Sequence, residues 1–263
     1  MIYGTAWKKE KTADLVQTAL KCGFRRLDTA CQPKHYNEAG VGKGIIESAI
    51  ERSELTIQTK FTPLEGQDRT NIPYNPSLPF REQVMESFHV SQENLQTEII
   101  DSYLLHSTMM PLKPLFEIWH TMENLVKQEN VKNIGVSNCY DIILLERLYS
   151  EADIKPSIIQ NRFDSDTNYD KEIRQFCRNK DIEYQAFWSL TANPYIVHSY
   201  QVSKIAHKYS MTNEQIFYRF LIQTGITPLN GTTSKRHMTE DLQIYDFELE
   251  ENEVETINQL LEL

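Results

Sequence analysis

The sequence predicts an α/β protein built as a single (β/α)8 barrel, the TIM-barrel architecture. Short apolar runs alternate with longer amphipathic segments about eight times along the chain, which is typical of parallel strands joined by crossover helices. The length of 263 residues suits one such barrel. No break in composition marks a second domain, so residues 1–263 are expected to form one domain.

Each element follows from a local pattern. The expected strands are the apolar runs at residues 2–5, 24–28, 55–60, 99–106, 131–136, 157–162, 182–187 and 226–229. The first helix carries its apolar residues on one face up to Leu20 and ends at Gly23, a C-cap residue. Apolar residues at helical spacing predict further helices at residues 41–52, 80–95, 115–126, 141–150, 171–180, 201–209, 212–223 and 254–261.

Two segments have an unusual composition. The segment 61–79 contains four prolines and is too long for a simple connection, so we expect it to wall a binding site together with residues 108–113. The glycine-rich run at residues 40–44 lacks the spacing of a phosphate-binding loop, and packing of its helix against the barrel is its predicted role.

Composition and charge exclude several classes of protein. The net charge of −10 argues against a nucleic-acid partner, and nine acidic residues with no Lys or Arg lie between positions 240 and 263. The four cysteines form no metal-binding or disulfide pattern, so no metal is expected. Without a membrane-length apolar run or a leader pattern, the sequence predicts no membrane partner and a cytoplasmic location.

Polar residues stand where the predicted strands end. Asp28, Lys60 and His106 close three successive strands, whose ends lie about 5 Å apart in a barrel. An aspartate beside a lysine fixes the ammonium group, and an ammonium beside a tyrosine lowers the phenol pKa from about 10. Such a tyrosine is able to protonate a carbonyl oxygen, while the histidine holds that oxygen in place.

These motifs, in this order, resemble those of the aldo-keto reductase family. Asp-Thr-Ala ends the second strand at Asp28, Asn-Glu follows Tyr36, and Leu-Leu precedes His106. Ile-Gly-Val-Ser-Asn closes the fifth strand and Gln160 lies on the sixth. The resemblance extends over essentially the whole chain.

The resemblance implies the roles of individual residues. Tyr36 is the general acid, Lys60 lowers its pKa, Asp28 pairs with Lys60, and His106 orients the carbonyl; His35 is a weaker candidate for the acid. Ser137, Asn138 and Gln160 match the positions that bind the carboxamide of an extended nicotinamide cofactor. The full cofactor set is Thr5, Asp28, Ser137, Asn138, Gln160, Phe187, Trp188, Ser189, Leu190, Asn193, Thr232, Ser234, Lys235, Glu240 and Asp241.

The chain also departs from the family pattern. The loop between Asp28 and Tyr36 is longer than usual, and Gly231 and His237 stand where a Lys and an Arg usually meet the cofactor 2′-phosphate. The neighbouring residues Thr232, Thr233, Ser234, Lys235 and Arg236 offer a replacement, so NADPH is expected, with NADH left open. We also expect a reduced N-terminal hairpin and a short C-terminal tail, and hence an open substrate pocket.

The function implied by this resemblance is reduction of a small aldehyde or ketone by hydride transfer, with Tyr36 as general acid. The alternative is a nicotinamide-binding redox sensor or regulatory partner with little turnover. A hydrolase with paired carboxylates fits less well, because Asp28 is the one clear acid at a strand end. The partner is expected to be a small carbonyl compound, and the chain a monomer or weak dimer.

Overall fold

The chain folds into a closed barrel. The computed structural model describes residues 1–262, and in it eight parallel strands pair in chain order, with β8 returning to β1. The strands are β1 (Ile2–Gly4), β2 (Arg26–Asp28), β3 (Thr56–Phe61), β4 (Ile100–Leu105), β5 (Val131–Ser137), β6 (Ile158–Arg162), β7 (Glu183–Phe187) and β8 (Ile226–Asn230). The predicted (β/α)8 barrel is therefore confirmed.

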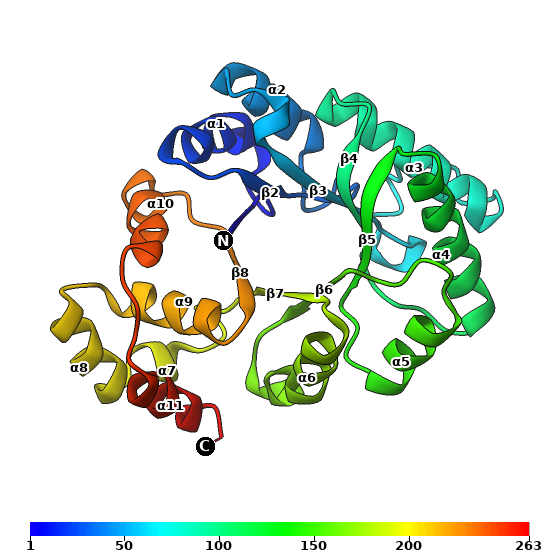
Figure 1. Cartoon of the computed structure of the whole chain (residues 1–263). Helices are drawn as coiled ribbons and strands as arrows, with labels where there is room; N and C mark the ends of the chain where they lie inside the picture. The colour runs from blue at the N-terminus through cyan, green and yellow to red at the C-terminus, as the bar shows by residue number, and fades with distance from the viewer. Residues whose placement is uncertain (263) are drawn as a thin grey trace.

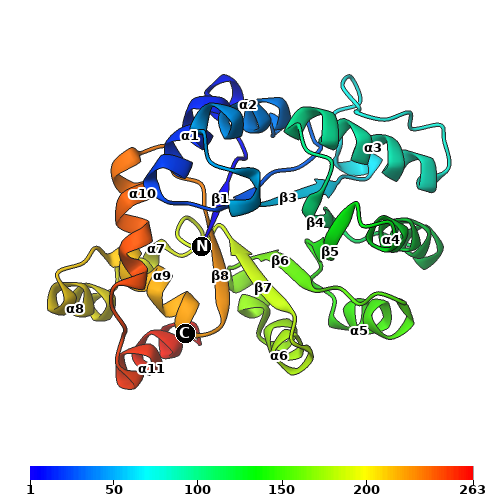
Figure 2. The same cartoon turned by 45° about the horizontal axis from the view of Figure 1, so that its top comes forward.

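Helices form the outer ring of the barrel, as Figure 1 shows. They are α1 (Thr12–Cys22), α2 (Glu38–Ser48), α3 (Phe80–Leu95), α4 (Leu112–Lys127), α5 (Ile142–Glu151), α6 (Lys171–Lys180), α7 (Pro194–Val197), α8 (Tyr200–Tyr209), α9 (Asn213–Gln223), α10 (Lys235–Leu242) and α11 (Glu251–Leu260). In both views α7, α8 and α11 gather outside β7 and β8, beside α9 (Figure 2). Within residues 1–262, no helix has the length and apolarity required to cross a lipid bilayer.

The second helix differs from its predicted range of 41–52. It begins earlier, because the Asn37 side chain accepts a hydrogen bond from the Gly40 N–H and caps the helix. It ends earlier at Ala49, which takes a left-handed conformation with φ of 58°. Glycine is needed inside α2 for close packing, since a Cβ on Gly42 would collide with the backbone carbonyl of Asn94. Gly42 thus packs on α3, and Gly44 packs on α1, so the run contacts neighbouring helices and not the barrel as predicted.

The barrel interior is polar at the level of the strand ends. Register places Asp28 beside Gln58 on β3, and Gln160 on β6 beside Gln185 on β7. Because alternate residues of a barrel strand point inward, these side chains meet inside the ring. The apolar core lies between strands and helices, around large buried side chains such as Trp119. The barrel interior at the strand ends therefore holds polar side chains that are able to take part in a reaction.

Candidate active site

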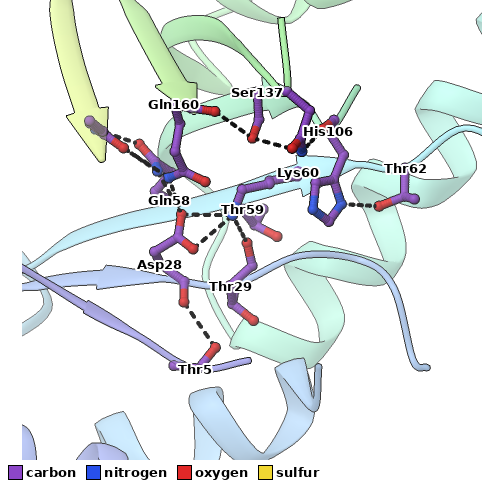
Figure 3. Close-up of polar contacts among 12 residues, drawn as sticks. Thr5, Asp28, Thr29, Gln58, Thr59, Lys60, Thr62, His106, Ser137 and Gln160 are labelled. Carbon is purple, nitrogen blue, oxygen red and sulfur yellow. Dashed lines mark hydrogen bonds and ion pairs between the residues drawn. The ribbon is translucent and has the colours of Figure 1, made fainter. Parts of the chain in front are cut away.

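A buried ion pair lies at the centre of the site. Lys60 is fully buried, and its Nζ donates to both carboxylate oxygens of Asp28 at 2.7 Å and to the Thr29 carbonyl at 2.8 Å (Figure 3). Asp28 in turn is held by its own backbone, whose carbonyl accepts from the Thr5 hydroxyl at 2.9 Å. All three ammonium protons of Lys60 are therefore used, and its charge acts on its surroundings through space.

Tyr36 lies against this ion pair. The segment after β2 turns back on itself, with the Tyr36 N–H donating to the Gln32 carbonyl, and Asn37 then starts α2. This turn brings Lys60 Nζ to 5.5 Å from the centroid of the Tyr36 ring. The His106 ring meets the Tyr36 ring edge to face, with centroids 5.9 Å apart. The four predicted catalytic side chains are thus brought together.

The structure does not show the lowering of the Tyr36 pKa that was expected from Lys60. Burial, and then the negative charge of Asp28, raise the pKa of Tyr36 above its ordinary value. Burial also lowers the pKa of Lys60, against the opposing effect of Asp28. The predicted lowering was wrong because desolvation outweighs an ammonium that is already neutralised by its carboxylate. At neutral pH the phenol consequently keeps its proton.

His106 is held as a neutral imidazole. Burial, and then the charge of Lys60, keep the pKa of His106 well below its usual value. Its Nδ1 lies 2.6 Å from the Thr62 hydroxyl oxygen, and its backbone carbonyl accepts from Asn138 at 2.8 Å. A hydroxyl that donates to Nδ1 selects the tautomer protonated on Nε2, which is able to donate to a carbonyl oxygen.

This contact yields a first prediction. Thr62→Val keeps the side-chain shape but removes the hydroxyl, and we expect kcat/KM for carbonyl reduction to fall about 3- to 10-fold, the worth of one neutral hydrogen bond. Thr121→Val is the matched control, since the buried Thr121 hydroxyl bonds only the Glu117 carbonyl of its own helix. Equal kinetics for the two variants would contradict a role of Thr62 in orienting His106.

Tyr36 and His106 face a cavity of 840 Å³ at the carboxyl ends of the strands. Its lining contains most of the residues predicted for cofactor binding, namely Asp28, Ser137, Asn138, Gln160, Phe187, Trp188, Ser189, Leu190, Thr232, Glu240 and Asp241. Burial raises the pKa of Asp241 to about 7. One face of Trp188 is covered by the Arg162 guanidinium at 4.2 Å from the ring centroid. Trp188 is nevertheless 52% exposed, whereas Phe187 is half-buried, and both offer apolar surface to the cavity.

Four predicted cofactor residues do not line the cavity. Thr5 is fully buried under Asp28, and the Asn193 amide donates to the Phe163 and Ser189 carbonyls. The Ser234 hydroxyl caps α10 by accepting from the His237 N–H, and Lys235, the first residue of α10, is exposed and outside the lining. These residues support the wall from behind or face away from the cavity.

His35, the weaker candidate for the acid, does not line this cavity, and its ring lies against Trp7 with centroids 3.9 Å apart. The expectation about the cavity walls needs correction. Among the described residues, neither segment 61–79 nor segment 108–113 contributes to the cavity lining. The walls come instead from the loops after β1, β7 and β8 and from α9.

Several lining residues were not predicted from the sequence. Lys8 is buried, donates to the Gly231 carbonyl across the cavity mouth, and has its pKa lowered to about 8 by burial. Its position directly after the first strand was an available signal. Arg236, named from the sequence as a possible phosphate-binding replacement, and His237 also line the cavity, beside Glu240. Helix α10 brings these residues to the cavity, and its orientation was not readable from the sequence.

The donors and acceptors near Asp28 fit a carboxamide. Gln160 uses its amide nitrogen on Asp28 and on Gln185, both at 2.9 Å, and no described residue donates to its oxygen. Ser137 and Asn138 lie beside it on the cavity wall, with Phe187 as an apolar surface. The Gln160 side-chain oxygen is an acceptor for a carboxamide N–H, and Phe187 is an apolar surface for a flat ring. The site therefore suits a nicotinamide.

Comparison with known proteins agrees with this geometry. The family model described as "Aldo/keto reductase family" matches residues 1–262. The chain is 31% identical over 251 residues to a glyoxal reductase of Bacillus subtilis (strain 168), covering 95% of this chain and 83% of that protein. It is 28% identical over 252 residues to a methylglyoxal reductase of Escherichia coli (strain K12), covering 95% and 85%.

Solved structures share the architecture. An aldo/keto reductase from Brucella melitensis superposes with a TM-score of 0.84 at 29% identity, covering 98% of this chain and 94% of that chain. An aldo-keto reductase from a Medee basin deep-sea metagenome library gives a TM-score of 0.85 at 27% identity, covering 98% and 90%.

Proposed function

The chain belongs to the aldo/keto reductase family and is an NAD(P)H-dependent oxidoreductase, and from this premise we propose that it reduces a small aldehyde or ketone to an alcohol with Tyr36 as proton donor. The observation that carries the proposal is the buried Asp28–Lys60 pair beside Tyr36, with His106 facing the same cavity. The reacting carbonyl group lies between the Tyr36 and His106 side chains in this proposal.

Each side chain has a defined task in this proposal. His106 donates from Nε2 to the carbonyl oxygen and holds it near Tyr36, whose hydroxyl passes its proton to that oxygen. Asp28 and Lys60 keep the tyrosine in a fixed electrostatic environment. A bound reduced nicotinamide supplies the hydride to the carbonyl carbon, with Ser137, Asn138 and Gln160 holding its carboxamide. Asp28 and Lys60 are buried, whereas Tyr36 and His106 are half-buried and face the cavity where the substrate would bind.

Turnover tests the proposal against the rival role of a redox sensor. The purified protein is mixed with NADPH or NADH and a panel of aldehydes and ketones that includes glyoxal and methylglyoxal, the compounds in the names of two relatives. Steady cofactor oxidation that depends on the carbonyl compound supports the reductase. Tight cofactor binding without oxidation across the panel contradicts it and favours the sensor.

For the cofactor we propose NADPH, with Arg236 and His237 meeting the 2′-phosphate. Both lie on the cavity wall near Thr232 and Thr233, which add hydroxyl donors. NADH is the alternative, and one observation favours it: Glu214, Glu240 and Asp241 line the same cavity and would repel a phosphate. Arg236 already lies 3.3 Å from Glu240, which reduces its free charge.

A pair of neighbouring variants separates these alternatives. Arg236→Gln is expected to raise the KM for NADPH roughly tenfold and to leave that for NADH unchanged, because one charge-assisted hydrogen bond to the phosphate is lost. Lys235→Gln removes the same charge one residue away and outside the lining, and should change neither value. A wild type with the higher kcat/KM for NADH would establish the alternative cofactor.

A further inference from the structure

Three glutamine amides fill the barrel interior beneath the ion pair. Gln58, Gln160 and Gln185 come from β3, β6 and β7 and are 3%, 3% and 0% exposed. Their side chains meet around the carboxylate of Asp28 (Figure 3 shows Gln58 and Gln160 directed at it). Buried amides are costly unless each hydrogen finds an acceptor, so the pattern of their hydrogen bonds is informative.

Every amide hydrogen in this cluster has a partner. Gln58 Nε2 donates to Asp28 Oδ1 at 2.6 Å and to Gln185 Oε1 at 2.8 Å. Gln160 Nε2 makes the same two bonds at 2.9 Å each. Gln185 Nε2 donates to Gln58 Oε1 and to Glu183 Oε2, both at 3.1 Å. Turning any one amide over would place its oxygen against another acceptor oxygen, and for Gln58 and Gln185 it would also place nitrogen against nitrogen, so all three orientations are fixed.

The far end of the cluster is anchored by a second ion pair. Arg26 binds Glu183 through two parallel hydrogen bonds of 2.8 and 2.7 Å, and the Thr227 hydroxyl donates to the same carboxylate at 2.8 Å. A bidentate pair of this kind defines both distance and plane. Gln185 is therefore held from below by Glu183 while it accepts from Gln58 and Gln160 above.

This arrangement controls both parts of the active site. Asp28 Oδ1 accepts from Gln58, Gln160 and Lys60, so the carboxylate cannot rotate without breaking several bonds. Lys60, whose remaining proton goes to Thr29, moves with it. Gln160 is fixed with its nitrogen inward, so it presents an acceptor to the cavity. Neither Gln58 nor Gln185 is among the cavity-lining residues.

We propose that Gln58 and Gln185 are positioning residues, which fix the Asp28 carboxylate and the Gln160 amide by interlocked hydrogen bonds and so hold Lys60 and the carboxamide acceptor in register with Tyr36. The proposal rests on the reductase function proposed above. Gln58 acts directly on Asp28, whereas Gln185 acts through Gln58 and Gln160.

The first test removes the Gln58 donor. Gln58→Leu is expected to lower kcat roughly 10- to 100-fold, the worth of one hydrogen bond to a charged group. Gln83→Leu is the matched control, because Gln83 is also buried and donates to two backbone carbonyls, those of Pro76 and Leu78, with no contact to the site. Urea unfolding of both variants corrects for losses that are merely structural.

The second test uses the near-isosteric Gln58→Glu. The introduced carboxyl group cannot donate to Asp28 when it is ionised but can when it is protonated, and burial raises the pKa of a carboxyl group. The charged groups around position 58 are Asp28 and Lys60 above and the Glu183–Arg26 pair below. The kcat of this variant relative to wild type should therefore recover as pH falls, while the loss in Gln58→Leu stays constant with pH.

Unfolding measurements make the test independent of turnover. Because the carboxyl group introduced by Gln58→Glu has a higher pKa in the folded than in the unfolded chain, the deficit in unfolding free energy relative to wild type should grow as pH rises. A deficit that does not change with pH overturns the proposal, as does a Gln58→Leu variant as active as Gln83→Leu. If wild type itself reduces no carbonyl compound, the proposed function fails, and a pH-dependent deficit larger than that of Gln83→Glu still supports the hydrogen bond from position 58 to Asp28.

Discussion

Replacing Tyr36 with phenylalanine is expected to lower kcat for aldehyde reduction by about 10²- to 10⁴-fold, the usual contribution of a general acid. The phenol lies on the cavity wall beside His106, and its ring centroid is 5.5 Å from Lys60 Nζ. Its pKa is raised by burial, so it carries its proton throughout the neutral range. Phenylalanine keeps the ring packing and removes only the hydroxyl with its proton.

Cofactor binding separates this loss from a damaged site. The dissociation constant for NADPH, measured by quenching of protein fluorescence, should remain unchanged in Tyr36→Phe. Tyr218→Phe is the matched control, because Tyr218 lines the same cavity from α9 and should retain wild-type kcat. A Tyr36→Phe enzyme with wild-type kcat would eliminate Tyr36 as the proton donor.

Lys60→Met is expected to destabilise the fold by about 3–5 kcal/mol, the cost of leaving a buried charge without its partner. Lys60 is fully buried and Asp28 is 2% exposed, so the carboxylate left behind has little access to water. The donors from Gln58 and Gln160 remain but carry no full charge. Urea unfolding at neutral pH measures the loss, and turnover should be lost with it.

Two further variants define what this loss means. Adding Asp28→Asn to Lys60→Met removes the stranded charge and should restore part of the unfolding free energy without restoring activity. Lys127→Met breaks an exposed pair with Asp153, where both side chains are at least half exposed, and should cost at most about 1 kcal/mol. Equal losses of unfolding free energy in Lys60→Met and Lys127→Met would contradict the stabilising role of the buried Asp28–Lys60 pair.

The family resemblance and the strand ends were sufficient to locate the chemistry. Asp28, Lys60 and His106 were expected to meet because parallel strands end at one face of a barrel, and they do meet there. Tyr36 joins them through the turn at Gln32 and the helix cap at Asn37, both of which depend on local sequence. Local signals of this kind survive folding because they involve neighbouring residues.

Details that depend on desolvation were not predictable. The raised pKa of Tyr36 and the lowered pKa of Lys60 follow from how deeply each group is buried, which a sequence does not record. The cavity walls were also misassigned: the proline-rich loop 61–79 lies outside the lining, whereas Lys8 reaches across it to Gly231. Such contacts join segments far apart in the chain.

The sequence by itself determined the barrel, the order of its elements and the family, because hydrophobic periodicity and short motifs are local properties. Only the tertiary structure decided which polar groups share the interior. Gln58 and Gln185 are 127 residues apart, yet each donates to the other across the barrel, and Gln58 also donates to Asp28. Their roles follow from strand register around a closed ring, a relation between distant strands that no local pattern contains.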